Sequence, residues 1–393
     1  MRIAILAAFP LHVIPGLEQH AHGGHEATWL PQLSQAFAAE EGWDIHWLTV
    51  SKRPGPVEPI RWRGQTFHCL HSPERGRLWR AFRPDRRVIR RRLDRLQPDL
   101  VHAWGTEDCY GLAGADAGRP WLLSMQGLLG EYIRRARMHP FVRLQAVYES
   151  SVLRQARDIS VESRWGEAVL RRMAPHARTH LVEYGVQEPF YRQTWAPQSD
   201  RPHAVFIGTI DPRKGVEDAV RAFAAPELQA KELHIIGDAE HRHARRLRAL
   251  STPNVRWLGR LDPGATAEAL CRAWCLILPT RADTSPNVVK EARVVGLPVI
   301  TTPHGGQSDY IHDGENGFLC EPGDVAAFTR ASVKILGDLD CARRLGAWHW
   351  EEQREFFQPA HTARRFLALY RELAAQGAAP VPAPTIATGQ RPF

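Results

Sequence analysis

The sequence has 393 residues, of which 44% are hydrophobic and 24% are charged, and its formal net charge at pH 7 is +8. This length is sufficient for two domains with buried cores. A basic chain suits an anionic ligand, an anionic membrane surface or nucleic acid, and the charge alone does not choose among them. The six cysteines match no zinc or disulfide framework, so we expect reduced and mostly buried thiols.

The first residues predict a buried strand. Met1 and Arg2 precede the apolar run 3–9, and Pro10 follows it. This run is at the lower limit for the core of a signal peptide, and no small-residue cleavage site follows it. No run of about 18 apolar residues occurs anywhere, so we expect no transmembrane helix and a cytoplasmic location.

Short apolar runs alternate with longer stretches of helical periodicity along the whole chain. The predicted strands are 3–9, 44–50, 100–104, 121–125 and 158–161 in the first half, and 204–207, 232–236, 255–258, 275–278 and 299–302 in the second. Continuous apolar runs are typical of parallel strands that are covered on both faces. Strands that alternate with helices in this way indicate an α/β fold of doubly wound sheets.

A polar, Pro-containing break between residues 185 and 203 divides the chain. We therefore predict a first domain over 1–190 and a second over 203–350. The helical segment 351–375 is interrupted at Pro359. The tail 376–393 is rich in Ala and Pro, and we expect it to lack fixed structure.

Ten arginines fall between Arg75 and Arg95, against two acidic residues, Asp85 and Asp94. Two interpretations stay open: a solvated surface helix, or a basic amphipathic face that binds anionic lipid on the inner side of a membrane. No helix-turn-helix, RNA-binding or zinc-finger pattern accompanies the arginines, so we expect no nucleic acid partner.

The most informative segment runs from Pro279 to residue 300. Ser285 is a good helix N-cap, and Pro286 suits the first helical position. Gly296 is placed to end the helix, and Pro298 prevents its continuation. The segment is therefore predicted as strand, loop, short helix and strand, with a loop where doubly wound sheets bind ligands. The backbone N–H groups of 285–287 favour an anion or ligand oxygens.

Two carboxylates belong to this segment. Asp283 lies in the loop, and Glu291 lies one helical turn beyond Asn287, at the edge of the buried stripe. A carboxylate at such a position is costly unless a partner satisfies it. Vicinal sugar hydroxyls are suitable partners, because one carboxylate can accept hydrogen bonds from both.

These residues resemble the motif of the retaining GT-B glycosyltransferases of GT4 type. Its two acids are separated by seven residues and followed by Gly-x-Pro-Val. Asp283 and Glu291 have this spacing, and the run 296–299 follows. The resemblance implies two facing Rossmann-like domains with a cleft between them, and a C-terminal helical segment, 351–375, that crosses back to the first domain. It also implies that Glu291 binds the donor ribose, while Asp283 and the backbone of Ser285, Pro286 and Asn287 hold the donor sugar. The first acid of the family is usually Glu, and Asp283 is a shorter variant.

The opening of the second domain resembles the diphosphate site of the same family. A predicted strand ends at Gly208, and Arg213, Lys214 and Gly215 precede a helix. Glycine lets the backbone approach a phosphate closely, and the cations neutralise it. Thr209 stands where the family usually has Arg, and Arg213 compensates for it in this interpretation. The resemblance implies that Arg213 and Lys214 stabilise the leaving diphosphate in place of a metal.

Further matches are looser. The resemblance places the backbone at Gly259 and Arg260 near the nucleobase, and Gly23 and Gly24 near the donor phosphates. A competing interpretation of the first loop is a metal site, because it also contains three histidines and a glutamate: His20, His22, His25 and Glu26. No further ligands are evident. Asp338 and Asp340 are spaced like a metal motif but lie in a helical region, so we expect neither metal nor cofactor.

The predicted strand 100–104 and the residues after it supply two more candidates, His102 and Glu107. Many members of the family have His where this chain has Trp104 and Gln126. His102 is as compatible with a plain strand-end histidine as with a catalytic one, and the same holds for Glu107.

The sequence therefore predicts an enzyme that transfers a sugar from a nucleotide-diphosphate sugar to a hydroxyl of a glycan or lipid-linked acceptor, with retention, in polysaccharide or glycolipid synthesis. The predicted catalytic residues are Asp283, Lys214, Arg213, His102 and Glu107. Two alternatives remain: an epimerase or hydrolase on the same fold, and a basic protein that binds lipid or nucleic acid.

Overall fold

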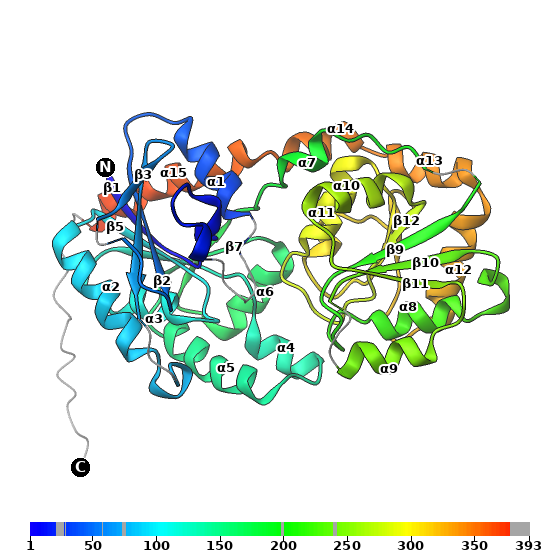
Figure 1. The fold of residues 1–393 in the computed structure, drawn as a ribbon, viewed down its shortest axis with the longest axis horizontal. Coiled ribbons are helices and arrows are strands. Elements are labelled where there is room, and N and C mark those ends of the chain that lie inside the picture. Colours follow the sequence, from blue (N-terminus) through cyan, green and yellow to red (C-terminus); the bar gives the residue numbers. More distant parts are fainter. Residues whose placement is uncertain are drawn as a thin grey trace, which may run out of the picture.

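The computed structural model describes residues 1–20, 27, 29–56, 58–72, 76–197, 200–238 and 242–377. They form two α/β domains that lie side by side, each around its own sheet (Figure 1). Both domains are doubly wound parallel sheets, as predicted from the strand pattern. None of the described helices has the length and apolarity needed to cross a membrane.

The sheet of the first domain has eight strands in the order β3-β4-β2-β1-β5-β6-β7-β8, all parallel except the β3–β4 pair. Its strands are β1 (Arg2–Leu6), β2 (Asp44–Ser51), β3 (Ile60–Trp62), β4 (Gln65–His71), β5 (Leu100–Trp104), β6 (Trp121–Ser124), β7 (Asp158–Val161) and β8 (Arg178–Leu181). The α-helices that follow these strands are α1 (Leu30–Ala38), α2 (Arg83–Leu96), α3 (Cys109–Ala115), α4 (Leu129–Arg135), α5 (Pro140–Leu153) and α6 (Arg164–Met173).

The sheet of the second domain has six parallel strands in the order β11-β10-β9-β12-β13-β14. The strands are β9 (His203–Ile207), β10 (Glu232–Ile236), β11 (Val255–Gly259), β12 (Cys275–Ile277), β13 (Val299–Thr301) and β14 (Gly317–Leu319). The α-helices are α7 (Glu188–Tyr191), α8 (Val216–Phe223), α9 (Arg242–Leu250), α10 (Pro263–Arg272), α11 (Asn287–Val295), α12 (Val325–Gly337), α13 (Leu339–Ala347) and α14 (Trp350–Phe356). Short 3-10 helices span Leu11–Val13, Glu18–His20, Leu78–Arg80, Pro226–Leu228 and Gly306–Asp309.

The last helix, α15 (Pro359–Gly377), returns to the first domain and lies beside α1 (Figure 1). Its apolar face is part of the core on one side of the first sheet, where Phe366 and Tyr370 are fully buried. The last helix of the chain and its first strand thus belong to the same hydrophobic core.

The chain passes between the domains twice, and the two passages lie against each other. The Val186 amide donates a hydrogen bond of 2.9 Å to the Phe357 carbonyl, and a Cβ on Gly185 would lie 2.5 Å from Pro359 Cα. Val186 and Phe190 belong to the core of the second domain, so the first domain ends near Gly185 rather than at residue 190.

The predicted returning segment 351–375 also needs a correction. Its first part, α14, stays on the second domain, where the indole of Trp350 donates to the Val294 carbonyl at 2.9 Å. The return therefore begins with α15. Its first residue is Pro359, and the missing N–H of proline suits the first turn of a helix.

A buried ion cluster fixes α11 against the first domain. The ammonium of Lys290, with a side chain that is 0% exposed, lies 2.9 Å from Glu162 and 3.0 Å from Glu183. Glu162 follows β7 and Glu183 follows β8, so both carboxylates come from the first domain. Burial raises the pKa of both carboxyls, and the ammonium opposes that shift.

We predict that Lys290→Met destabilises the protein by roughly 3–5 kcal/mol at pH 8, because two buried carboxylates lose their counter-charge. The loss should be smaller at pH 5, where carboxyls of raised pKa bind protons and become neutral. Urea denaturation at the two pH values measures both effects. Lys334→Met, on the exposed face of α12, is the control. An equal loss at both pH values would contradict the assignment of charge to this cluster.

Candidate active site

Each sheet has one point where the strand order reverses, and both points carry candidate residues. In the first sheet the reversal lies between β1 and β5, and in the second between β9 and β12. Doubly wound sheets bind ligands at the carboxyl ends of the strands beside such a reversal. The loop after β5 contains Glu107, and the loops after β9 and β12 contain Lys214 and Asp283.

Three charged side chains meet in the second domain. The carboxylate of Asp283 binds the ammonium of Lys214 and lies 3.3 Å from Nη1 of Arg213, which also donates to the Ala282 carbonyl at 2.9 Å. All three side chains are at most 15% exposed. Burial alone would raise the pKa of Asp283, but Lys214 and Arg213 outweigh it and hold the pKa below its usual value. The carboxylate thus stays ionised, and the cluster keeps a net positive charge.

Glycine makes this cluster possible. Gly215 has a φ of +70°, and a Cβ on it would lie 1.9 Å from the Pro279 carbonyl oxygen. No other residue combines this left-handed backbone with so close an approach. The loop after β9 can therefore press against the end of β12, which brings Lys214 to Asp283.

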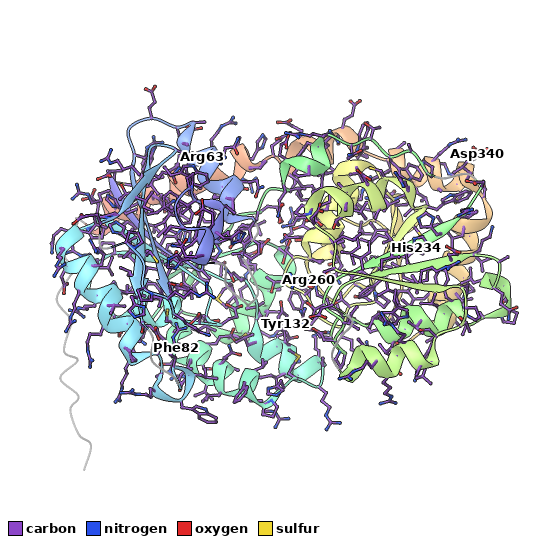
Figure 2. The ribbon with its side chains drawn as sticks, in the orientation of Figure 1. Arg63, Phe82, Tyr132, His234, Arg260 and Asp340 are labelled. Atoms are coloured by element: carbon purple, nitrogen blue, oxygen red, sulfur yellow. The ribbon has the colours of Figure 1, made fainter. Side chains whose placement is uncertain are left out.

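The first domain contributes Tyr132, which lies on α4 beside the cluster. Its hydroxyl is 3.0 Å from the Thr284 amide and 2.8 Å from Oγ1 of Thr284. The guanidinium of Arg213 lies over its ring, 4.6 Å from the ring centre, in a cation–π contact. Figure 2 labels Tyr132 and Arg260 near the boundary of the two domains. Tyr132 was not among the predicted site residues, because no sequence pattern distinguishes it from other aromatic residues of a helix.

Glu291 lies on α11, half-buried, and makes no hydrogen bond or ion pair with any residue that the structure describes. Burial raises its pKa to about 7, and the neighbouring Lys290 opposes this shift. Lys290 points the other way, into its contacts with Glu162 and Glu183. A carboxylate that is partly desolvated and unpaired is suited to accept hydrogen bonds from a ligand.

The start of α11 differs from the prediction. The helix begins at Asn287 with Pro286 as its N-cap, and Ser285 does not cap it. The hydroxyl of Ser285 lies 3.2 Å from Glu183 and 3.1 Å from the hydroxyl of Tyr310, so it is used in the contact between the domains. The end of the helix is as predicted, with Gly296 in a left-handed cap at φ +93°.

The structure describes three of the five remaining residues that were predicted at the donor site. Gly208 directly follows β9, and a Cβ on it would meet no atom closer than 3.9 Å. Gly259 ends β11 at a φ of +76°, and Arg260 after it is exposed. Gly23 and Gly24 lie outside the described residues, as do His22, His25 and Glu26 of the metal alternative.

Glu107 lies after β5, half-buried, where its carboxylate accepts a hydrogen bond of 2.8 Å from the Thr106 amide. Burial raises its pKa, against the opposing effect of nearby backbone amides, including that of Gly127. A Cβ on Gly127 would lie 2.8 Å from Glu107 Oε1 and 3.2 Å from Tyr132 Cε2. Glu107 and Tyr132 therefore border the same glycine, and Tyr132 in turn contacts Arg213 of the second domain.

His102 does not belong to the site. It is fully buried, and both ring nitrogens are bonded, to the hydroxyls of Tyr370 and Ser124 at 2.6 Å each. Burial lowers its pKa to about 3, so it is a neutral residue that connects α15 to the sheet. Trp104 is also buried, against Tyr184 and Phe366, rather than turned towards the second domain.

Two family models match the chain, one per domain. The "Glycosyl transferase 4-like domain" matches residues 23–185, and "Glycosyl transferases group 1" matches residues 201–338. The chain belongs to this GT4-type glycosyltransferase family. Its family and its GT-B fold are thus those that the Asp283–Glu291 segment predicted.

Three proteins show the extent of the similarity in sequence and in fold. Glycogen synthase of Mycobacterium tuberculosis is 29% identical over 157 residues, which are 38% of this chain and 37% of that protein. The chain thus matches well under half the length of this relative. Sucrose-phosphate synthase of Thermosynechococcus elongatus has a TM-score of 0.80 at 22% identity, over 96% of this chain and all of the other. HepE of Anabaena, solved with UDP and glucose, has a TM-score of 0.71 at 14% identity, over 95% and 100%.

We predict that Glu291→Gln stabilises the protein at pH 8 by roughly 1–3 kcal/mol and leaves its stability at pH 5 nearly unchanged. The pKa of Glu291 is higher in the folded protein than its ordinary value of 4.5. Its ionised form therefore opposes folding increasingly as the pH rises from about 4.5 through about 7. Urea denaturation at both pH values tests this, with the exposed Glu315→Gln as control. No gain at pH 8 would show that the Glu291 carboxylate is already satisfied.

Proposed function

We propose that this protein transfers a sugar from a nucleotide-diphosphate sugar to a hydroxyl acceptor. Two features together carry the proposal. One is the carboxylate of Glu291, which has no partner among the described residues, and the other is the buried cluster of Arg213, Lys214 and Asp283, whose loop leads into the helix of Glu291. A ribose offers vicinal hydroxyls to the first, and a diphosphate offers negative charge to the second. Membership of the family and the UDP found in HepE support the same donor class.

In this mechanism the acceptor hydroxyl replaces the diphosphate on the same face of the sugar, so the configuration is retained. Negative charge develops on the leaving diphosphate, and the ammonium of Lys214 and the guanidinium of Arg213 stabilise it without a metal ion. The Tyr132 ring holds Arg213 in place from the first domain. In this mechanism Glu107, with a pKa raised by burial, accepts the proton of the incoming hydroxyl.

The first test is a thermal-shift screen with UDP-, GDP-, ADP- and dTDP-sugars on the full chain. A ligand that binds the folded state alone should stabilise it by about 2.7 kcal/mol at 100 times its dissociation constant. We expect one nucleotide class to shift the transition, Glu291→Gln to abolish the shift, and Glu315→Gln to retain it. The absence of a shift with every donor would overturn the proposal.

The turnover number, measured with and without an acceptor, distinguishes a transferase from an epimerase or hydrolase. With the donor identified, Lys214→Ala should lower the turnover number by about 10²–10³-fold, because charge on the leaving group is no longer neutralised. Lys334→Ala should not. A donor that is epimerised or hydrolysed at the same rate with and without acceptors would favour an epimerase or hydrolase on this fold.

We further propose that α2 binds an anionic membrane surface on the cytoplasmic side. Arg83, Arg87, Arg91 and Arg95 repeat every four residues on one stripe, and all are exposed without an ion pair to a described residue. Arg77 and Arg86 do not add to this face, since they pair with Asp85 and Asp116 at 2.7 and 2.6 Å. Arg75 lies outside the described residues.

We expect the protein to sediment with vesicles that contain phosphatidylserine and not with neutral vesicles. Charge reversal by Arg87→Glu with Arg91→Glu should weaken this binding at least about tenfold, given about 1 kcal/mol per basic residue near such a surface. Raised salt should have the same effect. Arg245→Glu with Arg246→Glu, exposed on α9, is the matched control. Equal binding by the two double variants would assign α2 to the solvated-helix interpretation.

A further inference from the structure

The first domain contains a pocket of about 660 Å³ that the donor-site residues leave unexplained. It opens between the loop that precedes α2, the loop after β5 and the start of α5. The lining residues are Lys52, Gly76, Arg77, Leu78, Trp79, Phe82, Glu107, Asp108, Phe141 and Gln145. Of these, Glu107 has a role in the proposed transfer, and Arg77 pairs with the buried Asp85.

Contacts through Glu107, Gly127 and Tyr132 connect the pocket to the cluster of the second domain. The pocket wall includes Glu107, and both Glu107 and Tyr132 border the space where a side chain on Gly127 would lie. Tyr132 in turn contacts Arg213 and Thr284. A molecule that fills the pocket therefore reaches Glu107. From there, contacts through Tyr132 lead to Arg213, where the leaving diphosphate is proposed to bind.

Two large aromatic rings are exposed at this pocket. Trp79 is 70% exposed and Phe141 is 49% exposed, and their ring centres are 6.1 Å apart at an angle of 77°. A ligand that covers such rings gains stability, because apolar surface is removed from water. The C–H face of a sugar ring is flat, apolar and slightly positive, so it suits the negative face of an indole.

The segment that carries Trp79 is held in place by its own contacts. The hydroxyl of Tyr148 donates to the Leu78 carbonyl at 2.8 Å, and Arg77 lies over the Phe82 ring. Tyr148 also packs edge-on against Phe82. The exposure of Trp79 is thus a feature of a fixed segment.

The charges of the pocket cancel among the described lining residues. Lys52 and Arg77 are cations, and Glu107 and Asp108 are anions. Arg77 is already engaged, 2.7 Å from the buried Asp85 and 3.3 Å from Asp108. Little charge is left for a phosphate or carboxylate, whereas carboxylates and the Gln145 amide can bond to hydroxyl groups. This combination favours an uncharged polyhydroxylated ligand.

We propose that this pocket binds an uncharged saccharide as the acceptor, and that the Trp79 ring determines its specificity by stacking on a sugar face. The role of this saccharide as the acceptor rests on the proposed function. Binding of the saccharide itself does not depend on the donor site.

The decisive experiment is saturation-transfer NMR on the full chain without any donor. The probes are maltose, cellobiose and the para-nitrophenyl glycosides of glucose, galactose, mannose and N-acetylglucosamine, with glucose 6-phosphate as the charged probe. We expect at least one neutral saccharide to bind, Trp79→Ala to weaken it at least about tenfold, and Trp79→Phe to retain most of the binding. Phe356→Ala, which removes another exposed ring on α14, is the matched control.

Several results would overturn the proposal: no neutral saccharide binds, glucose 6-phosphate binds more tightly than the neutral probes, or Trp79→Ala binds as well as the unchanged protein. A saccharide that binds while no nucleotide-sugar does would disprove the proposed function and leave this site standing. With an active donor, Trp79→Ala should raise the acceptor KM at least about tenfold, and Phe356→Ala should leave it unchanged.

Discussion

The arrangement of the two domains depends on the ammonium of Lys290 between the carboxylates of Glu162 and Glu183. Removing such charges from water is costly, and the cost is recovered when opposite charges meet with good geometry. Lys290 belongs to the second domain and its partners to the first, so neither half satisfies its charges alone. Because α11 carries both Lys290 and Glu291, this contact also orients the carboxylate proposed to hold the donor ribose.

The two domains also meet through close backbone contacts around Thr284. A Cβ on Gly306 would lie 2.1 Å from the Thr284 carbonyl oxygen and 2.7 Å from Ser163 Cβ. The hydroxyl of Ser163 donates to the same carbonyl at 2.5 Å, and Tyr132 bonds to Thr284 from another side. Thr284 directly follows Asp283. The first domain thus positions the backbone of the donor loop, while side chains of the second domain supply its charge.

Structural features that depend on residues close together in the sequence were predicted correctly. Features that depend on residues far apart in the sequence were missed. The interval from Asp283 to Glu291 is local, as is the cap at Gly296, and both led to the correct family. Strands β4 and β8 were missed because β4 buries Gln65, Thr66 and His68 among its apolar residues, and β8 lies half exposed at a sheet edge. His102 was misplaced because its partner Tyr370 lies 268 residues further along the chain.

The electrostatics of the cluster bear on how a diphosphate could be held. Two cations against the single carboxylate of Asp283 leave a net positive charge in a buried place. Asp283 keeps both cations paired and so limits the cost of burying them. An incoming diphosphate would exceed the remaining charge, and the excess would fall to the positive end of α11 and to the exposed Arg260. In the proposed function, Asp283 therefore contributes by holding Lys214 and Arg213 in position as much as by contacting the sugar.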